Sequence, residues 1–308
     1  MRVRVKEERV DDNLLLESLI ERAAQINTKT VAVALAEDSE VIKAVIEASE
    51  RNLARFILYG NQEKIKALLD TTKYDIKIVH TDSSASAAEC AVKAVSSKEA
   101  DVLMKGNLAT NIILKAVLNK NFGLRTGNIL SHTAVFEIPE IDRLLIVTDA
   151  AMNVSPDLEQ KRQIIENAVW IAQSIGIDHP KVAPIAAVET VNPLMQATLD
   201  AAALTMMNKR GQIDGCSIDG PLALDNAVSN LAAKHKGIHS EVAGNADILL
   251  VPTIEVGNVL YKSLVYFAKA KVAAVISGAK APIVLTSRAD SSESKLHSLA
   301  LALCCATE

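Results

Sequence analysis

Short apolar runs alternate with longer amphipathic stretches along most of the chain, and this alternation constrains the fold more than any other feature. The apolar run TVAVALA at 30–36, for example, is followed at 40–52 by EVIKAVIEASERN, in which apolar residues recur at helical spacing. Strands that alternate with helices in this way are joined by right-handed crossovers and therefore lie parallel. We expect an α/β fold with mostly parallel sheets.

The composition supports helices packed on both faces of a buried sheet. Hydrophobic residues make up 49% of the chain and aromatic residues only 3%, whereas an antiparallel sandwich would normally contain more aromatics. The 308 residues exceed what one hydrophobic core usually serves, so we expect two domains. No repeat or Pro/Ser-rich linker interrupts the pattern, so composition does not give the domain boundary.

Charge and hydropathy disfavour several functional classes. The formal net charge is -4, and no basic run with interleaved aromatics is present, so we expect no nucleic-acid partner. No apolar stretch approaches the roughly 20 residues that span a bilayer, and the first residues lack the apolar core of a secretion signal. We therefore expect a cytoplasmic protein without a membrane partner.

The cysteines do not suggest a metal centre. Cys90, Cys216, Cys304 and Cys305 show no CxxC spacing and have no nearby pair of histidines. We expect buried, reduced thiols and no bound metal.

The first candidate site is an anion site after an apolar run. In open α/β sheets, ligands bind beyond the carboxyl ends of the strands. Lys105 and Gly106 follow the run at 102–104 and precede a helix that we expect to begin near Thr110. Glycine permits close approach of a ligand, the helix N-terminus offers N–H groups and lysine adds positive charge. A solvated lysine at a strand end is the simpler alternative.

A second candidate segment, 123–132, combines glycines, an arginine and short polar side chains. Arginine can hold phosphate or carboxylate with two hydrogen bonds, and hydroxyls supply further donors. An ordinary turn would account for the same residues, and a lone histidine more often has a structural role than a catalytic one. The candidates here are Arg125, Thr126, Gly127, Ser131 and His132.

Later segments supply carboxylates and another candidate helix start. Asp149 and Asp219 each follow an apolar run, and Asp157 is suited to cap the next helix. Asp219 could serve as an acid or base, although aspartate is commoner in turns and caps. Asn258 and Lys262 lie in a further helix start that could bind an anion.

The sharpest local feature is the hydroxyl and guanidinium of Ser287 and Arg288, which follow the last apolar run and precede the last helix. Asp290 and Glu293, three residues apart, fit a capping box, which would account for both carboxylates structurally. Ser287 and Arg288 have no comparable structural explanation, so they are the leading catalytic candidates.

Taken in order, these motifs resemble those of the phosphate butyryltransferase members of the phosphate acetyl/butyryltransferase family. The resemblance extends from about residue 30 to the end and includes MKG at 104–106, GLRTG at 123–127, DGPLALD at 219–225 and APIVLTSRADS at 281–291. It implies a fold like that of isocitrate and isopropylmalate dehydrogenases, with two α/β domains and the active site in the cleft between them. The implied domains are 1–132 completed by 284–308, and 133–283.

The resemblance also implies residue roles. Ser287 would contact the acyl carbonyl or thiol region, and Arg288 would hold the phosphoryl group. Related acetyltransferases place the presumed base, an aspartate, seven residues beyond that serine. Here the position is Ser294, which leaves the base open between Glu293 and Asp219. An arginine common in the family a few residues into the helix after the KG segment corresponds to Lys115, which lacks the planar fork of arginine.

The function implied by the resemblance is reversible transfer of a short acyl group, with butyryl favoured, between coenzyme A and phosphate. Coenzyme A is then a substrate, no cofactor is expected, and the thiolate attacks acyl phosphate in a ternary complex within a homodimer or higher homo-oligomer. A covalent acyl-Ser287 route, a nicotinamide-dependent dehydrogenase and an acyl-phosphate or acyl-CoA sensor stay open as alternatives. No GxGxxG follows any apolar run, which disfavours the dehydrogenase.

Overall fold

Eleven strands form one continuous sheet in the computed structural model, which describes residues 15–26, 28–70, 73–74, 76–139, 141–286 and 290–306. The strand order is β3-β2-β1-β4-β11-β10-β5-β6-β9-β7-β8. The strands are β1 Thr30–Ala34, β2 Arg55–Gly60, β3 Lys77–His80, β4 Val102–Lys105, β5 Ser131–Glu137, β6 Leu145–Thr148, β7 Lys181–Pro184, β8 Ser217–Ile218, β9 Ile248–Leu250, β10 Lys271–Ser277 and β11 Ile283–Val284.

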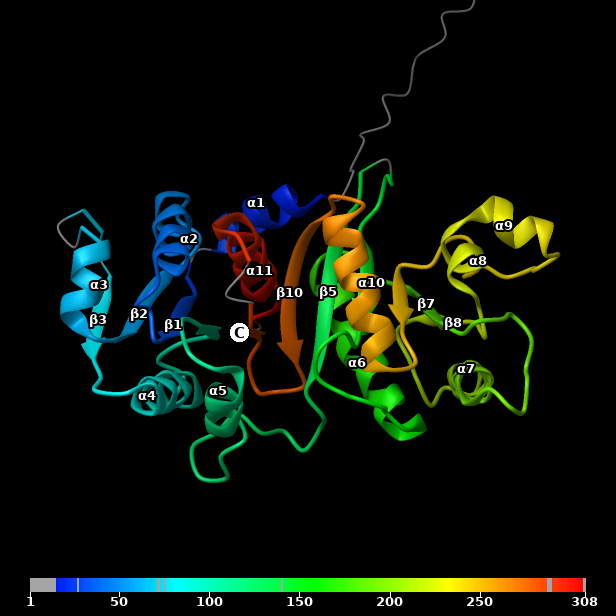
Figure 1. Ribbon diagram of the computed structural model, residues 1–308, viewed down its shortest axis with the longest axis horizontal. Helices are drawn as coiled ribbons and strands as arrows, with labels where there is room; N and C mark the ends of the chain where they lie inside the picture. Colours follow the sequence, from blue (N-terminus) through cyan, green and yellow to red (C-terminus); the bar gives the residue numbers. More distant parts are fainter. Residues whose placement is uncertain are drawn as a thin grey trace, which may run out of the picture.

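Helices cover both faces of this sheet, and the molecule is elongated along the strand order (Figure 1). They are α1 Leu16–Ile26, α2 Ser39–Glu50, α3 Gln62–Leu68, α4 Ser84–Ser96, α5 Thr110–Val117, α6 Leu158–Ser174, α7 Gln196–Lys209, α8 Leu224–Val228, α9 Asn230–His235, α10 Ile254–Tyr266 and α11 Ser292–Cys305. The expected α/β class with mostly parallel strands is confirmed.

Two parallel blocks make up the sheet, and an antiparallel ribbon of β10 and β5 joins them. The first block is β3-β2-β1-β4-β11, and the second is β6-β9-β7-β8. β10 is antiparallel to both β11 and β5, and β5 is antiparallel to β6. The strands of the two blocks therefore run in opposite directions, so their carboxyl ends lie at opposite ends of the strands. The division into two domains stays a prediction, since the sheet is continuous across the ribbon.

The junction between β11 and β10 is short. Ile276 of β10 pairs with Ile283 of β11, whereas Lys271–Ser277 pairs along its whole length with Ser131–Glu137. β10 thus extends well past the end of β11, and the chain that follows β11 enters α11 beside this extension. α11 packs against β10, α1 and α2.

Three apolar clusters hold the helices to the sheet. One cluster lies under α1, α2, α6 and α11 and includes Val33 of the first block and Ile146 of the second. On the opposite face, α4 and α5 cover the first block and α10 covers part of the second. The face that carries α5 and α10 is therefore shared by both halves of the molecule.

Of two helix starts predicted from the sequence, one is confirmed and the other is wrong. Asp157 caps α6 in a capping box with Gln160, as expected. The expected box of Asp290 and Glu293 is wrong, because the N-cap of α11 is Ser291, whose hydroxyl accepts the Ser294 N–H. The helix begins one residue later than the pattern indicated, so its third position is Ser294 and not Glu293.

Two further expectations concern the thiols and the membrane. The four cysteines are free; Cys216 and Cys305 are buried, whereas Cys90 and Cys304 are half-buried. Among the described residues, none of the helices is both long enough and apolar enough to cross a bilayer.

Candidate active site

Lys105 links the loops that follow two adjacent parallel strands. It is the last residue of β4 and only 5% exposed. Its Nζ lies 3.3 Å from the carbonyl oxygen of Gly106 and 3.3 Å from that of Thr286, which follows β11. A buried ammonium therefore sits where the chain leaves the sheet toward α11. Ser287 and Arg288 come next in the chain and lie outside the described residues.

Gly106 is needed for this arrangement. A Cβ built there would lie 2.1 Å from the Leu35 carbonyl oxygen and 2.6 Å from that of Ala34. Any side chain would push the Lys105–Gly106 loop away from the end of β1. The glycine that the sequence suggested for ligand approach thus also permits close packing of backbone on backbone.

Ser131 and His132, expected to act together, point to opposite faces of the sheet, as neighbours on a strand must. The Ser131 hydroxyl accepts a 2.8 Å hydrogen bond from the Asn167 side chain of α6. His132 faces α10, where the Tyr261 ring lies 5.9 Å from its own. Only His132 shares a face with Lys105.

His132 is a buried histidine. Burial lowers its pKa, and the nearby carboxylates of Asp149 and Asp290 oppose that change. Its Nδ1 has no hydrogen-bond partner within the part of the chain that the structure describes. Since buried polar atoms are usually paired, an orphan nitrogen at this position is a feature that a functional account must address.

The turn after β6 brings Asp149 beside His132. Asp149 Oδ1 accepts the backbone N–H groups of Ala151 and Met152, and its Oδ2 accepts the Asn153 side chain at 2.6 Å. The Asn153 amide also donates to the Leu130 carbonyl oxygen. The turn is therefore fixed to the segment that leads into β5.

α10 is fitted closely against this turn. A Cβ at Gly257 would lie 2.6 Å from the Asp149 carbonyl oxygen and 2.9 Å from the Ala150 Cα. One helical turn later, Tyr261 covers His132 and also contacts the Phe136 ring at 5.3 Å. Burial raises the pKa of the Tyr261 phenol, and the Asp290 carboxylate adds to the effect.

A cavity of about 290 Å³ beside α5 holds two more of the expected residues. Arg125 is exposed at its rim, and Gly127 lies in the left-handed region with φ +101°. Lys115, also exposed, lies on α5, whose residue Val117 lines the cavity. The Thr126 hydroxyl is used differently, because it donates to the Gly278 carbonyl oxygen at 2.6 Å and fixes the turn.

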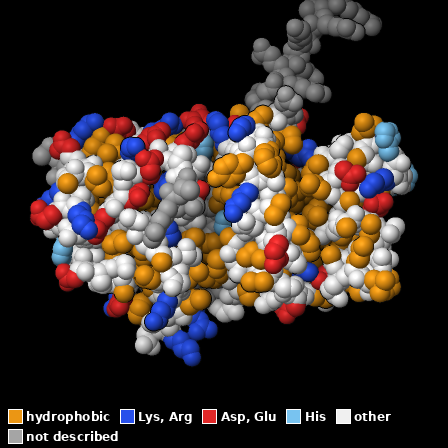
Figure 2. Space-filling view, viewed as in Figure 1, with side chains coloured by type: hydrophobic (Ala, Val, Ile, Leu, Met, Phe, Trp, Pro, Cys, Tyr) orange, Lys and Arg blue, Asp and Glu red, His pale blue; other side chains and the backbone are white. Residues whose placement is uncertain are grey.

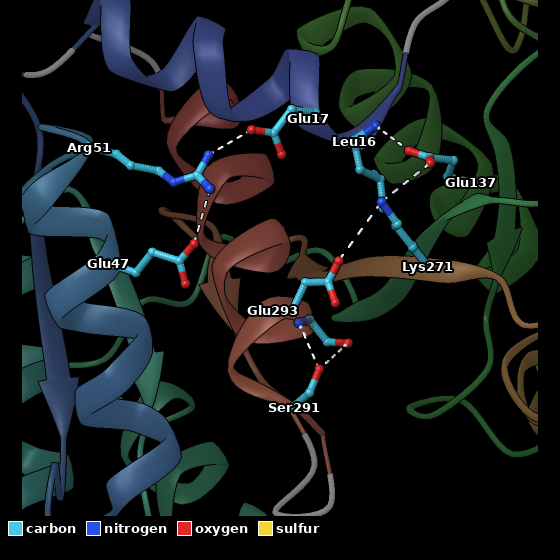
Figure 3. A network of polar contacts seen from close by, with 9 residues as sticks. Leu16, Glu17, Glu47, Arg51, Glu137, Lys271, Ser291 and Glu293 are labelled. Carbon is cyan, nitrogen blue, oxygen red and sulfur yellow. Dashed lines mark hydrogen bonds and ion pairs between the residues drawn. The ribbon is translucent and has the colours of Figure 1, made fainter.

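The remaining candidates lie on α10, after β8 and at the start of α11. Asn258 and Lys262 are exposed on α10. Asp219 follows β8 at the sheet edge, six strands along from β11 in the strand order. Glu293 is exposed and points to Lys271 at 3.9 Å, beside Glu137 (Figure 3). Neither Asp219 nor Glu293 is thus brought to the end of β4.

Three described residues that contact His132 or act on its pKa were not identified as site residues from the sequence: Asp149, Tyr261 and Asp290. Asp149 carried a usable signal, since it comes directly after a buried strand. Asp290 was assigned to a cap that it does not form. Tyr261 carried no signal, because its approach to His132 depends on long-range packing.

Comparisons with known proteins show the family of this chain. Residues 69–303 match the family model described as Phosphate acetyl/butaryl transferase. The chain is 60% identical over 294 residues to a "Probable phosphate butyryltransferase" of Bacillus subtilis (strain 168), a match that covers 95% of this chain and 98% of the relative.

Two solved structures resemble this chain, one in sequence and fold and the other in fold alone. A branched-chain phosphotransacylase from Enterococcus faecalis V583 is 39% identical with a TM-score of 0.83, covering 90% of this chain and 99% of that one. A 4-hydroxythreonine-4-phosphate dehydrogenase from Klebsiella pneumoniae has a TM-score of 0.54 at 13% identity, covering 91% of this chain and 100% of that one. The second likeness concerns the fold alone, and it fits the expected dehydrogenase-like architecture.

Proposed function

We propose that this chain, which belongs to the phosphate acetyl/butyryltransferase family, catalyses reversible transfer of a short acyl group between coenzyme A and inorganic phosphate. The favoured reaction is butanoyl-CoA + phosphate = butanoyl phosphate + CoA. One observation supports it most strongly. Buried Lys105 joins the loop after β4 to Thr286, immediately before the Ser287-Arg288 pair in the chain, so its positive charge lies where we propose that a phosphoryl group leaves.

The substrate-binding roles follow from charge and exposure. Lys105 and Gly106 would bind the phosphoryl group, and His132 lies on the same face of the sheet, three strands along. Exposed Arg125 and Gly127 at the α5 cavity would hold an anionic part of coenzyme A, with a further contact from exposed Lys115 on α5. Asn258 and Lys262 on α10 are assigned a weaker contact with the same substrate. The hydroxyls of Thr126 and Ser131 would shape these segments through the hydrogen bonds described above.

The chemistry requires mainly positioning. A free thiol of ordinary pKa, about 8.5, is a few per cent thiolate at neutral pH and already a strong nucleophile. In a ternary complex the thiolate would attack the acyl carbonyl, Ser287 and backbone N–H groups would stabilise the oxyanion, and phosphate would leave beside Arg288. Direct transfer needs no acyl-serine.

Butyryl is the proposed acyl group, supported by the named relative from Bacillus subtilis. Each buried methylene contributes about 0.8 kcal/mol, so a small change in pocket depth would shift the preference toward branched or shorter acyl groups. No cofactor or metal enters the proposal, and coenzyme A acts as a substrate. The cytoplasm is the proposed location.

A homodimer or higher homo-oligomer is the proposed assembly. Exposed apolar side chains gather over α10 and the part of the molecule to its right (Figure 2). Val259 is 65% exposed and Phe267 is 86% exposed. A largely apolar hollow of about 420 Å³ at Ile185, Met195 and Val256 adjoins them. Exposed patches of this kind commonly mark subunit interfaces.

Replacing Arg288 tests the site assignment. Arg288→Ala should lower turnover in phosphate-dependent release of coenzyme A from butyryl-CoA by about 10²–10³-fold, because a charge-assisted contact to the phosphoryl group is lost. Asp157→Ala, which removes only the α6 cap, should leave turnover near wild type. An Arg288→Ala enzyme with normal turnover and phosphate affinity would remove Arg288 from the mechanism.

A further inference from the structure

A cavity of about 640 Å³ lies beside α4, and none of the residues that line it has a role in the site described above. The lining comes from β2 and β3, the last two strands at this end of the sheet, from α4 and its C-terminal end, and from the turn that follows α5. Its volume falls in the range of sites that hold small molecules, roughly 300–1,000 Å³. The cavity is therefore large enough to bind a ligand of its own.

The reactive group in this cavity is the thiol of Cys90. Cys90 is a free, half-buried cysteine on α4. Lys93 and Ala94, one helical turn farther along, line the same cavity, so all three residues lie on one face of the helix. The reactivity of a thiol depends on its access to small molecules as well as on its acidity. The cavity gives Cys90 that access.

A second side chain in the lining, that of Tyr59 on β2, points to a ligand independently. Tyr59 is only 5% exposed and pairs with Val79 of β3, which also lines the cavity. Its hydroxyl oxygen is not sealed from solvent, and it has no hydrogen-bond partner in the part of the chain that the structure describes. Burial raises the pKa of Tyr59 to about 12, so the phenol keeps its proton. A ligand with an acceptor atom would satisfy this donor.

The charges around the cavity favour an anionic ligand. Lys77 and Lys93 both line it, and among the described lining residues Glu99 supplies the single carboxylate, which leaves one positive charge in excess. Glu99 pairs with Lys77 at 2.7 Å, and Glu89 pairs with Lys93 at 2.6 Å from outside the lining. Both pairs are exposed and therefore weak. An anionic group that enters the cavity can thus approach either ammonium.

The cavity also adjoins the turn that leads to Arg125. Phe122 lines it, and Lys93 Nζ lies 5.1 Å from the centre of the Phe122 ring. The turn is tight, because the Asn119 side-chain oxygen accepts the Phe122 N–H at 3.3 Å and a Cβ at Gly123 would lie 2.4 Å from the Asn119 carbonyl oxygen. Arg125 follows at the rim of the α5 cavity. A ligand that displaces Phe122 would therefore displace Arg125 as well.

We propose that Cys90 is a modification site that forms a mixed disulfide with an anionic low-molecular-weight thiol, and that this adduct weakens the binding of coenzyme A at the α5 cavity. The second part rests on the acyl-transfer function proposed above, whereas the adduct itself does not. Coenzyme A and glutathione, each in its disulfide form, share the required chemistry. Both carry negative charge for Lys77 and Lys93, and both have amide carbonyl groups that can accept the Tyr59 hydroxyl.

The reaction is a thiol–disulfide exchange whose oxidant is the disulfide of the small thiol. Cys90 loses its proton, and its Sγ attacks one sulfur of that disulfide. A new S–S bond forms as the old one breaks, and the second sulfur leaves with the electron pair and takes up a proton. The Cys90 sulfur is thereby oxidised, and one molecule of the small thiol is released in reduced form.

Peptide mass spectrometry of the reduced full chain tests the site. The chain is incubated with oxidised coenzyme A, oxidised glutathione or the neutral hydroxyethyl disulfide, and we expect the first adduct at Cys90. Lys93→Gln should slow the reaction with the two anionic disulfides about threefold and leave the neutral one unchanged. The faster anionic disulfide identifies the thiol. No adduct at Cys90, or one that forms as fast at Cys304, the other half-buried cysteine, would overturn the proposal.

Kinetics of the modified chain test the coupling to Arg125. The adduct should raise KM for coenzyme A about threefold, because an exposed charge contact is lost, and dithiothreitol should reverse the change. Cys90→Ser should lose both adduct and response with unmodified kinetics, and Cys304→Ser should keep both. An adduct at Cys90 with unchanged KM would overturn the coupling. If unmodified wild type exchanges no acyl group, the proposed function fails instead, and mass spectrometry of wild type still decides the modification site.

Discussion

At the scale of single residues, close backbone approach decides where the site's loops lie. Gly106 lets the loop after β4 rest on the end of β1, and Gly257 lets α10 rest on the turn of Asp149. Both glycines face backbone atoms, which cannot rotate away as a side chain can. The positions of Lys105 and Tyr261 therefore depend on the absence of a neighbouring methyl group.

Gly257→Ala tests this dependence. The new methyl group would meet the Asp149 carbonyl oxygen and the Ala150 Cα, so α10 must shift at a cost of about 1–3 kcal/mol in the free energy of unfolding. Urea denaturation measures the loss, and kcat should fall because Tyr261 moves with the helix. Ser263→Ala, on the same helix, should change neither. Wild-type stability and kcat in Gly257→Ala would show that the turn and helix tolerate separation.

At the scale of secondary-structure elements, a buried ion pair joins α6 to α7. Lys161 Nζ lies 2.5 Å from Asp200 Oδ2, with both side chains nearly buried. Gln196 donates to the other carboxylate oxygen. Breaking such a pair leaves an uncompensated charge, whereas replacing both partners with apolar groups is often neutral.

Asp200→Asn should therefore destabilise the protein by about 3–5 kcal/mol in urea denaturation at neutral pH. The double variant Lys161→Met/Asp200→Leu, which removes both charges, should recover most of that loss. A double variant as unstable as Asp200→Asn would contradict this account. It would mean that the hydrogen bonds of the pair, and not its charge balance, stabilise the α6–α7 contact.

The packing of α11 adds a pH dependence. His297 is buried, and burial lowers its pKa from 6.5; Glu293, Glu17 and Glu137 oppose the change and Lys271 adds to it. Arg51, which follows the last residue of α2, pairs with Glu17, so this surface is rich in charge (Figure 3). The imidazole of His297 therefore binds a proton more tightly in the unfolded chain than in the folded protein. The stability that neutral His297 contributes is present above its pKa in the unfolded chain, and it is lost as pH falls through its pKa in the folded protein.

The thermal midpoint of wild type should thus decrease as pH falls below about 6.5, and His132, whose pKa is also lowered by burial, contributes in the same direction. His297→Gln should reduce the slope of unfolding free energy against pH by at most about 1.4 kcal/mol per pH unit. An unchanged slope in that variant would mean that His297 is protonated alike in folded and unfolded protein.

At the scale of the whole molecule, local patterns predicted the elements but not how the two halves join. The alternation of runs anticipated the parallel strands, and Asp157 anticipated a helix start. The pairing of Lys271–Ser277 with Ser131–Glu137 links segments far apart in sequence, and no local signal reports it. His132 on β5 meets Tyr261 of α10 through packing of this long-range kind, which explains why Tyr261 was not identified as its neighbour from the sequence.

The apolar face over α10 bears on assembly. Val259→Asp would place a charge on that face, where desolvating it in an interface is costly. Analytical ultracentrifugation should show dissociation to monomers, whereas Leu68→Asp on α3, also exposed, should leave the assembly unchanged. A wild type that sediments as a monomer would contradict the proposed homo-oligomer.

The central claim is the reaction itself, and thiol release from a series of acyl-CoAs, from acetyl to hexanoyl, tests it most directly. The assay is run with and without inorganic phosphate, with a chelator present throughout. We predict release that requires phosphate and is fastest with butyryl-CoA; a maximum at another chain length would correct only the substrate. Absence of phosphate-dependent release with every acyl-CoA would contradict the acyltransferase function.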